Sequence, residues 1–307
     1  MGVAVLFPGQ GSQLPRMGEP WRDHPAWEIV ERAEAAVGEP LAFLLLEADA
    51  DQLGRTREAQ LAILMASLLA WEAVREVMAT PVGAAGHSLG QLTALVATGA
   101  LSLDDGVRLV VRRAEVTQAA ADRTGGGMIA LLGATLEQAE EVCRPPSGAE
   151  RACWVANDNA PGQVVLAGTP AGLEAAAANA ARTGAGKVRA LGVGGAFHTP
   201  LMDTARDAFQ PALDATTFAT PSCPVVSNVD ARPYGESGGW PARLSDHLVR
   251  PVRWSESMQA LVGLGASSFL EVGPGGVLRG LARRIVPGRQ VRNVAVPDDV
   301  PSLLEVA

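Results

Sequence analysis

The sequence predicts an α/β fold in which a large domain with a parallel sheet is interrupted by a ferredoxin-like small domain. Two observations predict it. Short apolar runs alternate with amphipathic segments in both terminal parts of the chain, as the strands and helices of a parallel sheet do. After Gly125-Gly126-Gly127 the pattern changes to β-α-β-β-α-β, the order of a ferredoxin-like unit. We therefore expect a large domain over 1–123 and 195–307 and a small domain over 124–194.

Composition excludes several classes of protein. The 307 residues are 48% hydrophobic, which is enough for a large core. A net charge of −8 argues against a nucleic-acid partner. No run approaches the roughly 18 apolar residues of a membrane span, and the first apolar run ends at Pro8 without a basic start, so we expect a cytoplasmic protein. The three cysteines are odd in number and unclustered, which argues against a disulfide framework or a metal site.

The elements of the large domain follow from periodicity and capping residues. Before the small domain we expect strands over 3–7 and 82–85 and helices over 25–37, 58–78, 89–100 and 103–121. Gly38 ends one helix, and Ser102 with Asp105 begins another. After it we expect strands over 224–228 and 268–272 and a helix over 255–262.

Within the small domain, strands are expected over 128–132, 153–157, 163–167 and 187–193, and helices over 135–143 and 169–182. Thr135 and Gln138 form the capping box of the first of these helices. The Gly273-Pro274-Gly275-Gly276 turn lacks the G-x-G-x-x-G pattern and the Walker lysine, so it does not predict a nucleotide site.

The most informative local motif is Gly86-His87-Ser88-Leu89-Gly90, which joins an apolar strand to an apolar helix. It has the form of a nucleophile elbow, in which a sharp turn exposes the serine oxygen near helix N–H groups. The alternative is a glycine-serine turn without chemistry. Among four histidines, His198 is the best candidate base because it follows a flexible glycine pair and precedes a helix. A core histidine would also explain that position.

Arg112 and Arg113 are adjacent on an expected helix and point about 100° apart. If one of them faces inward, its guanidinium requires an internal carboxylate or a carboxylate-bearing ligand. The alternative is a pair of solvated arginines.

Four motifs together resemble the malonyl-CoA:acyl-carrier-protein transacylase family, which includes the acyltransferase domains of polyketide synthases. They are Phe7-Pro8-Gly9-Gln10-Gly11-Ser12-Gln13, Gly86-His87-Ser88-Leu89-Gly90, Ala196-Phe197-His198-Thr199-Pro200-Leu201-Met202 and Glu271-Val272-Gly273-Pro274-Gly275. They occur in the order and at the spacing of the family, so the resemblance covers nearly the whole chain. It implies an α/β-hydrolase-like large domain with an inserted ferredoxin-like domain.

The resemblance also implies roles for individual residues. Ser88 matches the acyl-accepting nucleophile and His198 its base. Gln10 and Leu89 match the positions whose backbone N–H groups form the oxyanion hole. Arg113 matches the arginine that binds the free carboxylate of a malonyl-type substrate.

Further positions complete the implied substrate pocket. Gln60 and Gln118 fall on family glutamines, and Phe197 resembles malonyl-selecting members because its ring narrows the space for a substituent. Thr117 stands where methionine is usual and enlarges that space. Arg250 stands where asparagine is common, at a position implied to orient the histidine through its main-chain carbonyl.

A further departure, Gln91 in place of the usual glutamate, removes a charge near the elbow. The expected function is ping-pong transfer of a malonyl-type group from coenzyme A through Ser88 to an acyl carrier protein, without a cofactor or a metal. The alternatives are a thioesterase-like hydrolase, transfer of an unusual acyl group between carrier proteins, and a non-catalytic docking module. Arg113 argues against the hydrolase, because simple acyl groups need no carboxylate clamp.

Overall fold

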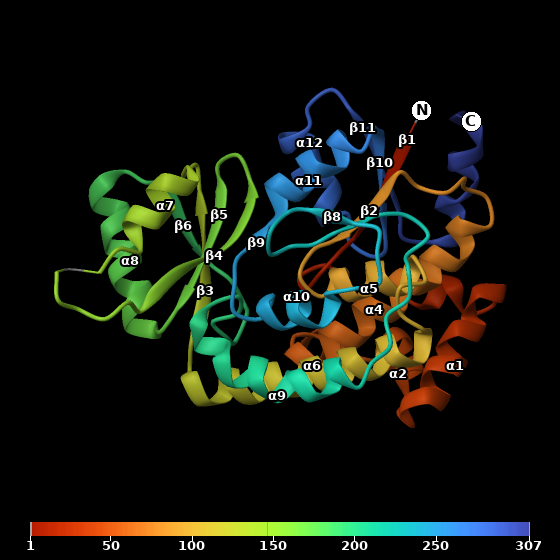
Figure 1. Cartoon of the computed structure of the whole chain (residues 1–307), viewed down its shortest axis with the longest axis horizontal. Coiled ribbons are helices and arrows are strands. Elements are labelled where there is room, and N and C mark those ends of the chain that lie inside the picture. The colour runs from red at the N-terminus through yellow and green to blue at the C-terminus, as the bar shows by residue number, and fades with distance from the viewer. Residues whose placement is uncertain (1, 146, 307) are drawn as a thin grey trace.

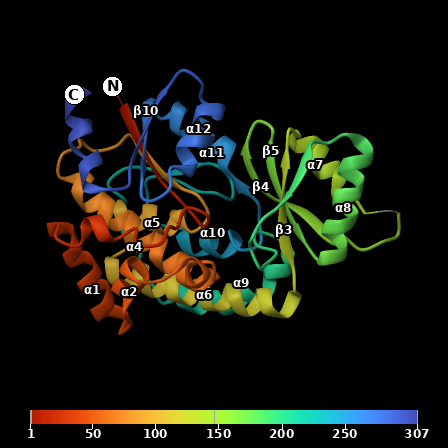
Figure 2. The same cartoon turned by 180° about the vertical axis from the view of Figure 1, so that it is seen from behind.

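The chain forms a mixed α/β structure with two sheets (Figures 1 and 2). The computed structural model describes residues 2–145 and 147–306. The larger sheet has the strand order β11-β10-β1-β2-β7-β8. Its strands run parallel except β8, which pairs antiparallel with β7 at one edge. These strands are β1 (Gly2–Phe7), β2 (Gly83–Gly86), β7 (Val225–Val226), β8 (Pro233–Tyr234), β10 (Ala266–Val272) and β11 (Gln290–Val294).

Helices cover both faces of this sheet because its strands bury alternate residues on opposite sides. Val5 and Phe7 of β1 belong to the core cluster under α4 and α5, whereas Ala4 and Leu6 belong to the cluster under α11 and α12. The helices outside the small domain are α1 (Glu28–Val37), α2 (Leu41–Leu46), α3 (Ala50–Leu53), α4 (Thr56–Arg75), α5 (Gly90–Ala97), α6 (Leu103–Thr124), α9 (Asp203–Asp214), α10 (Trp240–Asp246), α11 (Trp254–Gly263) and α12 (Val277–Ile285). Short 3-10 helices lie at Glu19–Trp21, Pro25–Trp27, Pro200–Met202, Pro297–Asp299 and Pro301–Val306.

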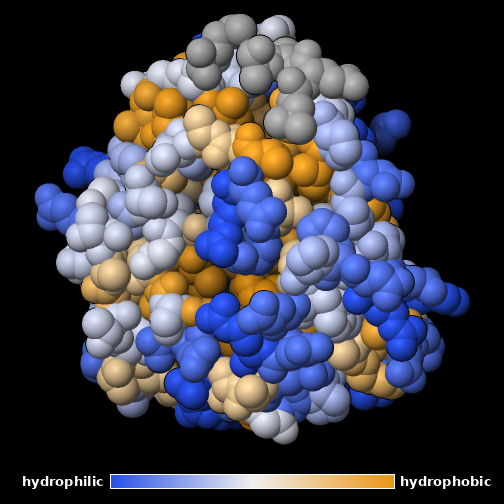
Figure 3. Space-filling model, turned by 90° about the vertical axis from the view of Figure 1, so that its right-hand side faces the viewer, coloured by the Kyte–Doolittle hydropathy of each residue, from blue (hydrophilic) through white to orange (hydrophobic). Residues whose placement is uncertain are grey.

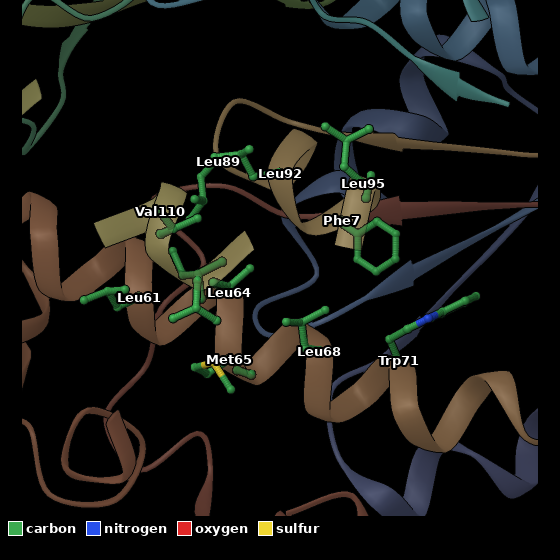
Figure 4. Packing of buried hydrophobic residues seen from close by; sticks show 14 of the residues in the cluster. Phe7, Leu61, Leu64, Met65, Leu68, Trp71, Leu89, Leu92, Leu95 and Val110 are labelled. Carbon is green, nitrogen blue, oxygen red and sulfur yellow. The ribbon is translucent and has the colours of Figure 1, made fainter. Parts of the chain in front are cut away.

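The helix α4 forms the centre of the larger core. Figure 4 shows its Leu61, Leu64 and Leu68 facing the side chains of α5 and α6. Phe7 at the end of β1 meets Trp71 edge to face, with ring centroids 5.9 Å apart. This packing fixes the end of β1, from which the Pro8–Gln13 loop departs.

The second sheet forms a separate lobe, seen at the left of Figure 1, with the order β6-β3-β5-β4-β9. Its elements are β3 (Gly127–Leu132), α7 (Leu136–Val142), β4 (Cys153–Ala160), β5 (Gln163–Gly168), α8 (Pro170–Thr183) and β6 (Lys187–Ala190), joined by β9 (Val252–Arg253). The expected β-α-β-β-α-β order is confirmed for residues 127–190. The strand β9 pairs in parallel with β4 at Asn157 and Asp158, so a segment from outside the expected small domain adds an edge strand to its sheet.

Capping residues place several helix ends where the sequence predicts them. Gly38 ends α1 in the left-handed conformation at φ 70°. The Ser102 side chain accepts a hydrogen bond from the Asp105 N–H at the start of α6, and Thr135 and Gln138 form the reciprocal capping box of α7.

Two placements of side chains become visible only in the fold. Cys143 Sγ lies within 2.8 Å of Cys153 Sγ in the core between α7 and β4, and both are free cysteines. His247 follows α10 directly and is buried, although α10 carries the charged residues Arg243 and Asp246.

Among the described residues, no helix combines the length and the apolar content needed to cross a membrane. The face that carries α1 and α2 shows hydrophobic side chains divided by charged and polar ones (Figure 3).

Candidate active site

The elbow between β2 and α5 holds Ser88 in a conformation that few non-glycine residues adopt, with φ of 52°. Glycine is required on both sides because the backbone approaches itself closely. A Cβ on Gly86 would lie 1.7 Å from the Gly90 carbonyl oxygen, and a Cβ on Gly90 would lie 2.1 Å from the Phe7 carbonyl oxygen. The two glycines therefore let the turn close, and the serine side chain points away from the sheet.

The Ser88 hydroxyl meets an imidazole from a distant segment. Ser88 Oγ lies 2.8 Å from His198 Nε2. His198 Nδ1 lies 2.8 Å from the His247 carbonyl oxygen, which can only accept a hydrogen bond. The proton of the neutral ring is therefore on Nδ1, and the lone pair on Nε2 faces the serine hydroxyl. This is the arrangement that a serine nucleophile needs.

Burial, followed by the positive charge of Arg113, lowers the pKa of His198 to about 3. His198 is 4% exposed. The ring is consequently neutral at physiological pH and able to accept a proton. His247 lies beside it with ring centroids 4.9 Å apart, and burial lowers the pKa of His247 as well.

Arg113 points inward from α6 and is 6% exposed, whereas Arg112 pairs with Glu115 on the surface. One Arg113 nitrogen donates to Ser88 Oγ at 3.2 Å, and another donates to Gln60 Oε1. No ion pair within residues 2–145 and 147–306 includes Arg113. Burial lowers its pKa to about 10, which leaves it charged at neutral pH. A buried cation without a carboxylate next to the serine is suited to an anionic ligand.

The backbone around the serine offers N–H groups. Within the described ranges, the amides of Gln10 and Leu89 donate to no protein acceptor. The Gln10 loop is held against the elbow, because a Cβ on Gly9 would lie 2.4 Å from the His87 carbonyl oxygen. Leu89 immediately precedes α5, whose dipole favours negative charge at this end. Both amides are suited to an oxyanion.

A model of the acyl transferase domain family matches residues 5–303. The chain belongs to this family. It is 38% identical to a malonyl CoA-acyl carrier protein transacylase of Bacillus subtilis, over 99% of this chain and 96% of the relative. It is 36% identical to a transacylase of the same name from Salmonella typhimurium, over 92% of each chain.

Solved structures of the family superpose on nearly the whole chain. An acyl-carrier-protein-S-malonyltransferase from Bartonella henselae matches with a TM-score of 0.94 and 33% identity, over 100% of this chain and 99% of the other. A malonyl-transacylase solved in complex with its type II polyketide acyl-carrier protein also matches with a TM-score of 0.94, at 31% identity over 100% of both chains.

Two residues assigned from the acyl transferase resemblance lie away from their expected roles. Arg250 does not orient the histidine. The carbonyl next to His198 Nδ1 belongs to His247, and the Arg250 side chain pairs with Asp246 at 3.4 Å on the surface. Gln118 is half-exposed and donates to Asp122 at 2.7 Å, because five residues along α6 rotate it by about 140° from Arg113.

The remaining pocket positions of this acyl transferase are distributed around Arg113. Gln60 is buried, and its Nε2 lies 3.5 Å from Thr117 Oγ1. The Thr117 hydroxyl donates to the Arg113 carbonyl at 2.8 Å, so it is occupied within α6. Phe197 is half-buried between two core clusters, and its contact with substrate stays a prediction.

Sequence reasoning missed Asn228, which lies two residues beyond β7 and contacts the elbow. It also left the Glu271 motif of this acyl transferase unexplained. The Glu271 carboxylate accepts the N–H groups of Leu278 and Arg279 at 3.0 and 2.7 Å, and it thereby fills the N-terminus of α12. A Cβ on Gly275 would lie 3.0 Å from Ser12, so this turn packs against the loop that carries Gln10.

A cavity of about 480 Å³ lies between the small lobe and the segments at 198–200 and 249–251, and His198 forms part of its wall. Trp154, Pro200 and Pro251 give it apolar walls, and Arg144 and Arg151 also line it. This volume is in the range of small-ligand sites.

Proposed function

We propose that the chain transfers a malonyl-type acyl group from coenzyme A, through an ester on Ser88, to the phosphopantetheine thiol of an acyl carrier protein. The observation that carries this proposal is the buried guanidinium of Arg113 next to the Ser88 hydroxyl, which pairs with no carboxylate of the described residues. The names of the relatives agree with it, since they are malonyl CoA-acyl carrier protein transacylases.

In the first half-reaction, His198 Nε2 takes the Ser88 hydroxyl proton while Ser88 Oγ attacks the thioester carbonyl carbon. The carbonyl oxygen becomes an oxyanion that accepts hydrogen bonds from the Gln10 and Leu89 amides. When the carbon–sulfur bond breaks, the His198 imidazolium returns the proton to the leaving thiolate. The products are free coenzyme A and the acyl-serine ester.

In the second half-reaction, the carrier thiol gives its proton to His198 Nε2, and the sulfur attacks the ester carbonyl. The carbon–oxygen bond to Ser88 breaks, and the same proton reprotonates Ser88 Oγ. The His247 carbonyl keeps the ring oriented, and it stabilises the imidazolium of each step through the Nδ1 proton.

Arg113 selects the acyl group. Gln60 accepts a hydrogen bond from one terminal nitrogen of Arg113 and thereby orients the guanidinium. A bidentate pair between this guanidinium and the terminal carboxylate of the substrate then places the thioester carbonyl near Ser88. Thr117 leaves more room beside this pair than a methionine does. We accordingly propose that substituted malonyl groups are also accommodated, within the limit that Phe197 sets.

The finer descriptions of the molecule are also proposals. We propose an α/β-hydrolase-like large domain over 1–123 and 195–307 with an inserted ferredoxin-like domain over 124–194. The strand order β6-β3-β5-β4 supports the second assignment. The reaction as written needs no cofactor beyond the coenzyme A thioester, and a cytoplasmic location stays a prediction.

The test is acyl loading followed by intact-mass analysis. The wild-type protein should gain one malonyl group from malonyl-CoA, and Ser88→Ala should gain none. Arg113→Ala should lose malonyl loading by about 100-fold or more, because a buried charge partner is removed, while acetyl loading rises. Equal loss of both would show that Arg113 is structural.

Two other outcomes would favour the alternative functions. If malonate is released faster than the carrier protein is acylated, a hydrolase is favoured. If the protein is loaded only from an acylated carrier, carrier-to-carrier transfer is favoured.

A further inference from the structure

Asn228 lies two residues beyond β7 and is completely buried. Its Nδ2 donates a hydrogen bond to the Gly86 carbonyl at 2.8 Å, and its Oδ1 accepts one from the Ser88 N–H at 2.9 Å. Its own N–H donates to Gln91 Oε1 at 2.9 Å. One residue therefore joins the backbone before the elbow, the nucleophile itself and the first turn of α5.

The need for this side chain follows from where the sheet ends. The strands β2 and β7 pair at Ala84 with Val225 and at Ala85 with Val226, and the ladder stops there because the chain turns at the elbow. The next buried groups, the Gly86 carbonyl and the Ser88 N–H, would be unpaired at a cost of about 1–3 kcal/mol each. A primary amide offers the same acceptor and donor as a peptide group. The Asn228 side chain thus continues the ladder into the turn.

The same contact bears on the position of the nucleophile. A non-glycine residue at positive φ is strained by about 1–3 kcal/mol and keeps that conformation only when its surroundings hold it. Ser88 has φ of 52°, and its N–H is held by Asn228. The direction of its side chain, and hence the 2.8 Å approach of Oγ to His198, depends on this backbone conformation. So does the direction of the following Leu89 N–H.

Gln91 completes the arrangement from the first turn of α5, where it is completely buried. Its Oε1 faces the Asn228 N–H, whereas its Nε2 has no hydrogen-bond partner in the part of the chain that the structure describes. The side-chain oxygen is therefore the atom through which Gln91 contacts Asn228. A glutamate could supply the same acceptor only together with a buried charge.

From these contacts we propose that Asn228 and Gln91 form an amide clamp that positions the Ser88 hydroxyl and the Leu89 amide for acyl transfer. The proposal rests on the proposed function for the identity of the reaction. Neither residue contacts the reacting atoms, so both are positioning residues.

The first test compares Asn228→Ala with Asn179→Ala. Asn179 also donates a side-chain hydrogen bond to a backbone carbonyl, that of Val142, but in the small lobe far along the chain from the elbow. We expect Asn228→Ala to lower kcat for malonyl transfer by about 10- to 100-fold with KM within about threefold, because misplacement of a reacting group acts on the chemical step. Asn179→Ala should leave both constants unchanged.

The second measurement is the rate at which an alkylphosphonofluoridate labels Ser88, followed by intact mass. This reagent reports the reactivity of the hydroxyl without any acyl-CoA. Labelling should slow in Asn228→Ala in parallel with kcat. If the wild-type protein is labelled but takes no malonyl group, the proposed function fails while the clamp remains testable on the same variants.

Asn228→Asp gives a pH signature. The ionised carboxylate can accept a hydrogen bond from the Ser88 N–H, but its other oxygen then faces the Gly86 carbonyl oxygen without a proton between them. The protonated carboxyl group can donate a hydrogen bond to that carbonyl, as the amide does. Burial raises the pKa of such a carboxyl group. Labelling of Asn228→Asp should therefore recover as the pH falls from 8 to 5, whereas Asn228→Ala should not recover.

The clamp is wrong if Asn228→Ala is less stable to heat yet labels within about twofold of the wild-type rate. If Asn228→Ala does not fold, the proposal is tested by labelling of two Gln91 variants. Gln91→Leu removes the acceptor and should slow labelling several-fold, whereas Gln91→Glu keeps the acceptor and should restore it. Equal rates in these two variants would also overturn the proposal.

Discussion

At the scale of single residues, His198 shows how burial prepares a base for its task. Desolvation and the nearby Arg113 charge both disfavour the imidazolium, so the resting ring is neutral. This environment raises the free energy of the protonated ring. The protonated ring exists only during the reaction and is stabilised by the His247 carbonyl.

Because the pKa of His198 is lowered, we expect the rate of the acylation step not to fall at mildly acidic pH. Because Nε2 keeps its lone pair at every pH above a pKa of about 3, the single-turnover rate of Ser88 malonylation should be constant from pH 8 down to pH 5. Rapid-quench mass analysis measures this rate, with malonyl-CoA alone as the control for hydrolysis. A decline centred near pH 6.5 would contradict the prediction.

At the scale of elements, the junction of β2 and α5 depends on close backbone contact more than on side-chain chemistry. The strand ends at Gly86, close to the Gly90 carbonyl, and only three residues separate it from the start of the helix at Gly90. Any side chain at these two positions meets backbone atoms, which cannot move aside without opening the turn.

Gly86→Ala is therefore expected to abolish malonyl loading or to prevent folding, since its Cβ would lie 1.7 Å from a carbonyl oxygen. The matched control is Gly280→Ala in α12, where a Cβ meets nothing within 4 Å. Higher helix propensity should stabilise that variant by about 0.5–1 kcal/mol. Thermal denaturation and acyl loading measure both effects. Normal loading by Gly86→Ala would show that the elbow is more adaptable than its contacts indicate.

At the scale of the whole molecule, the site is assembled where the two lobes meet. Ser88 comes from the larger sheet, and His198 lies after the last strand of the smaller one. The strand β9 crosses back to pair with β4, and it ties the segment that follows His247 to the second sheet. The relative position of the lobes therefore sets the distance between the nucleophile and its base.

Buried histidines also make global stability sensitive to acid. The pKa of His247 is lowered by burial in the folded state, so the unfolded chain binds its proton more tightly, and the stability from this group is lost as the pH falls below about 6.5. Between pH 7 and pH 5 one such group accounts for about 2 kcal/mol of the free energy of unfolding.

His247→Gln should accordingly reduce the difference in unfolding free energy between pH 7 and pH 5 by about that amount. Urea denaturation at the two pH values measures it. Gln210→Ala on α9 is the control and should keep the wild-type difference. An unchanged difference in His247→Gln would mean that the ring is protonated in the folded protein.

The sequence by itself determined the local features. The elbow, the capped starts of α6 and α7 and the glycine that ends α1 depend on residues within about four positions of one another, so a short window contains the information. The candidate pair Ser88 and His198 was also accessible, because few residue types perform their chemistry. Only the resemblance to the acyl transferase family distinguished Arg113 from Arg112.

Only the tertiary structure decided which groups support them. The partner of His198 is the carbonyl of His247, 49 positions away, and a backbone carbonyl has no signature in the residue that carries it. Asn228 reaches Ser88 across 140 positions, and Cys143 meets Cys153 only after the small lobe has folded. Such contacts depend on how sheets and helices pack, which the chemistry of a single segment does not encode.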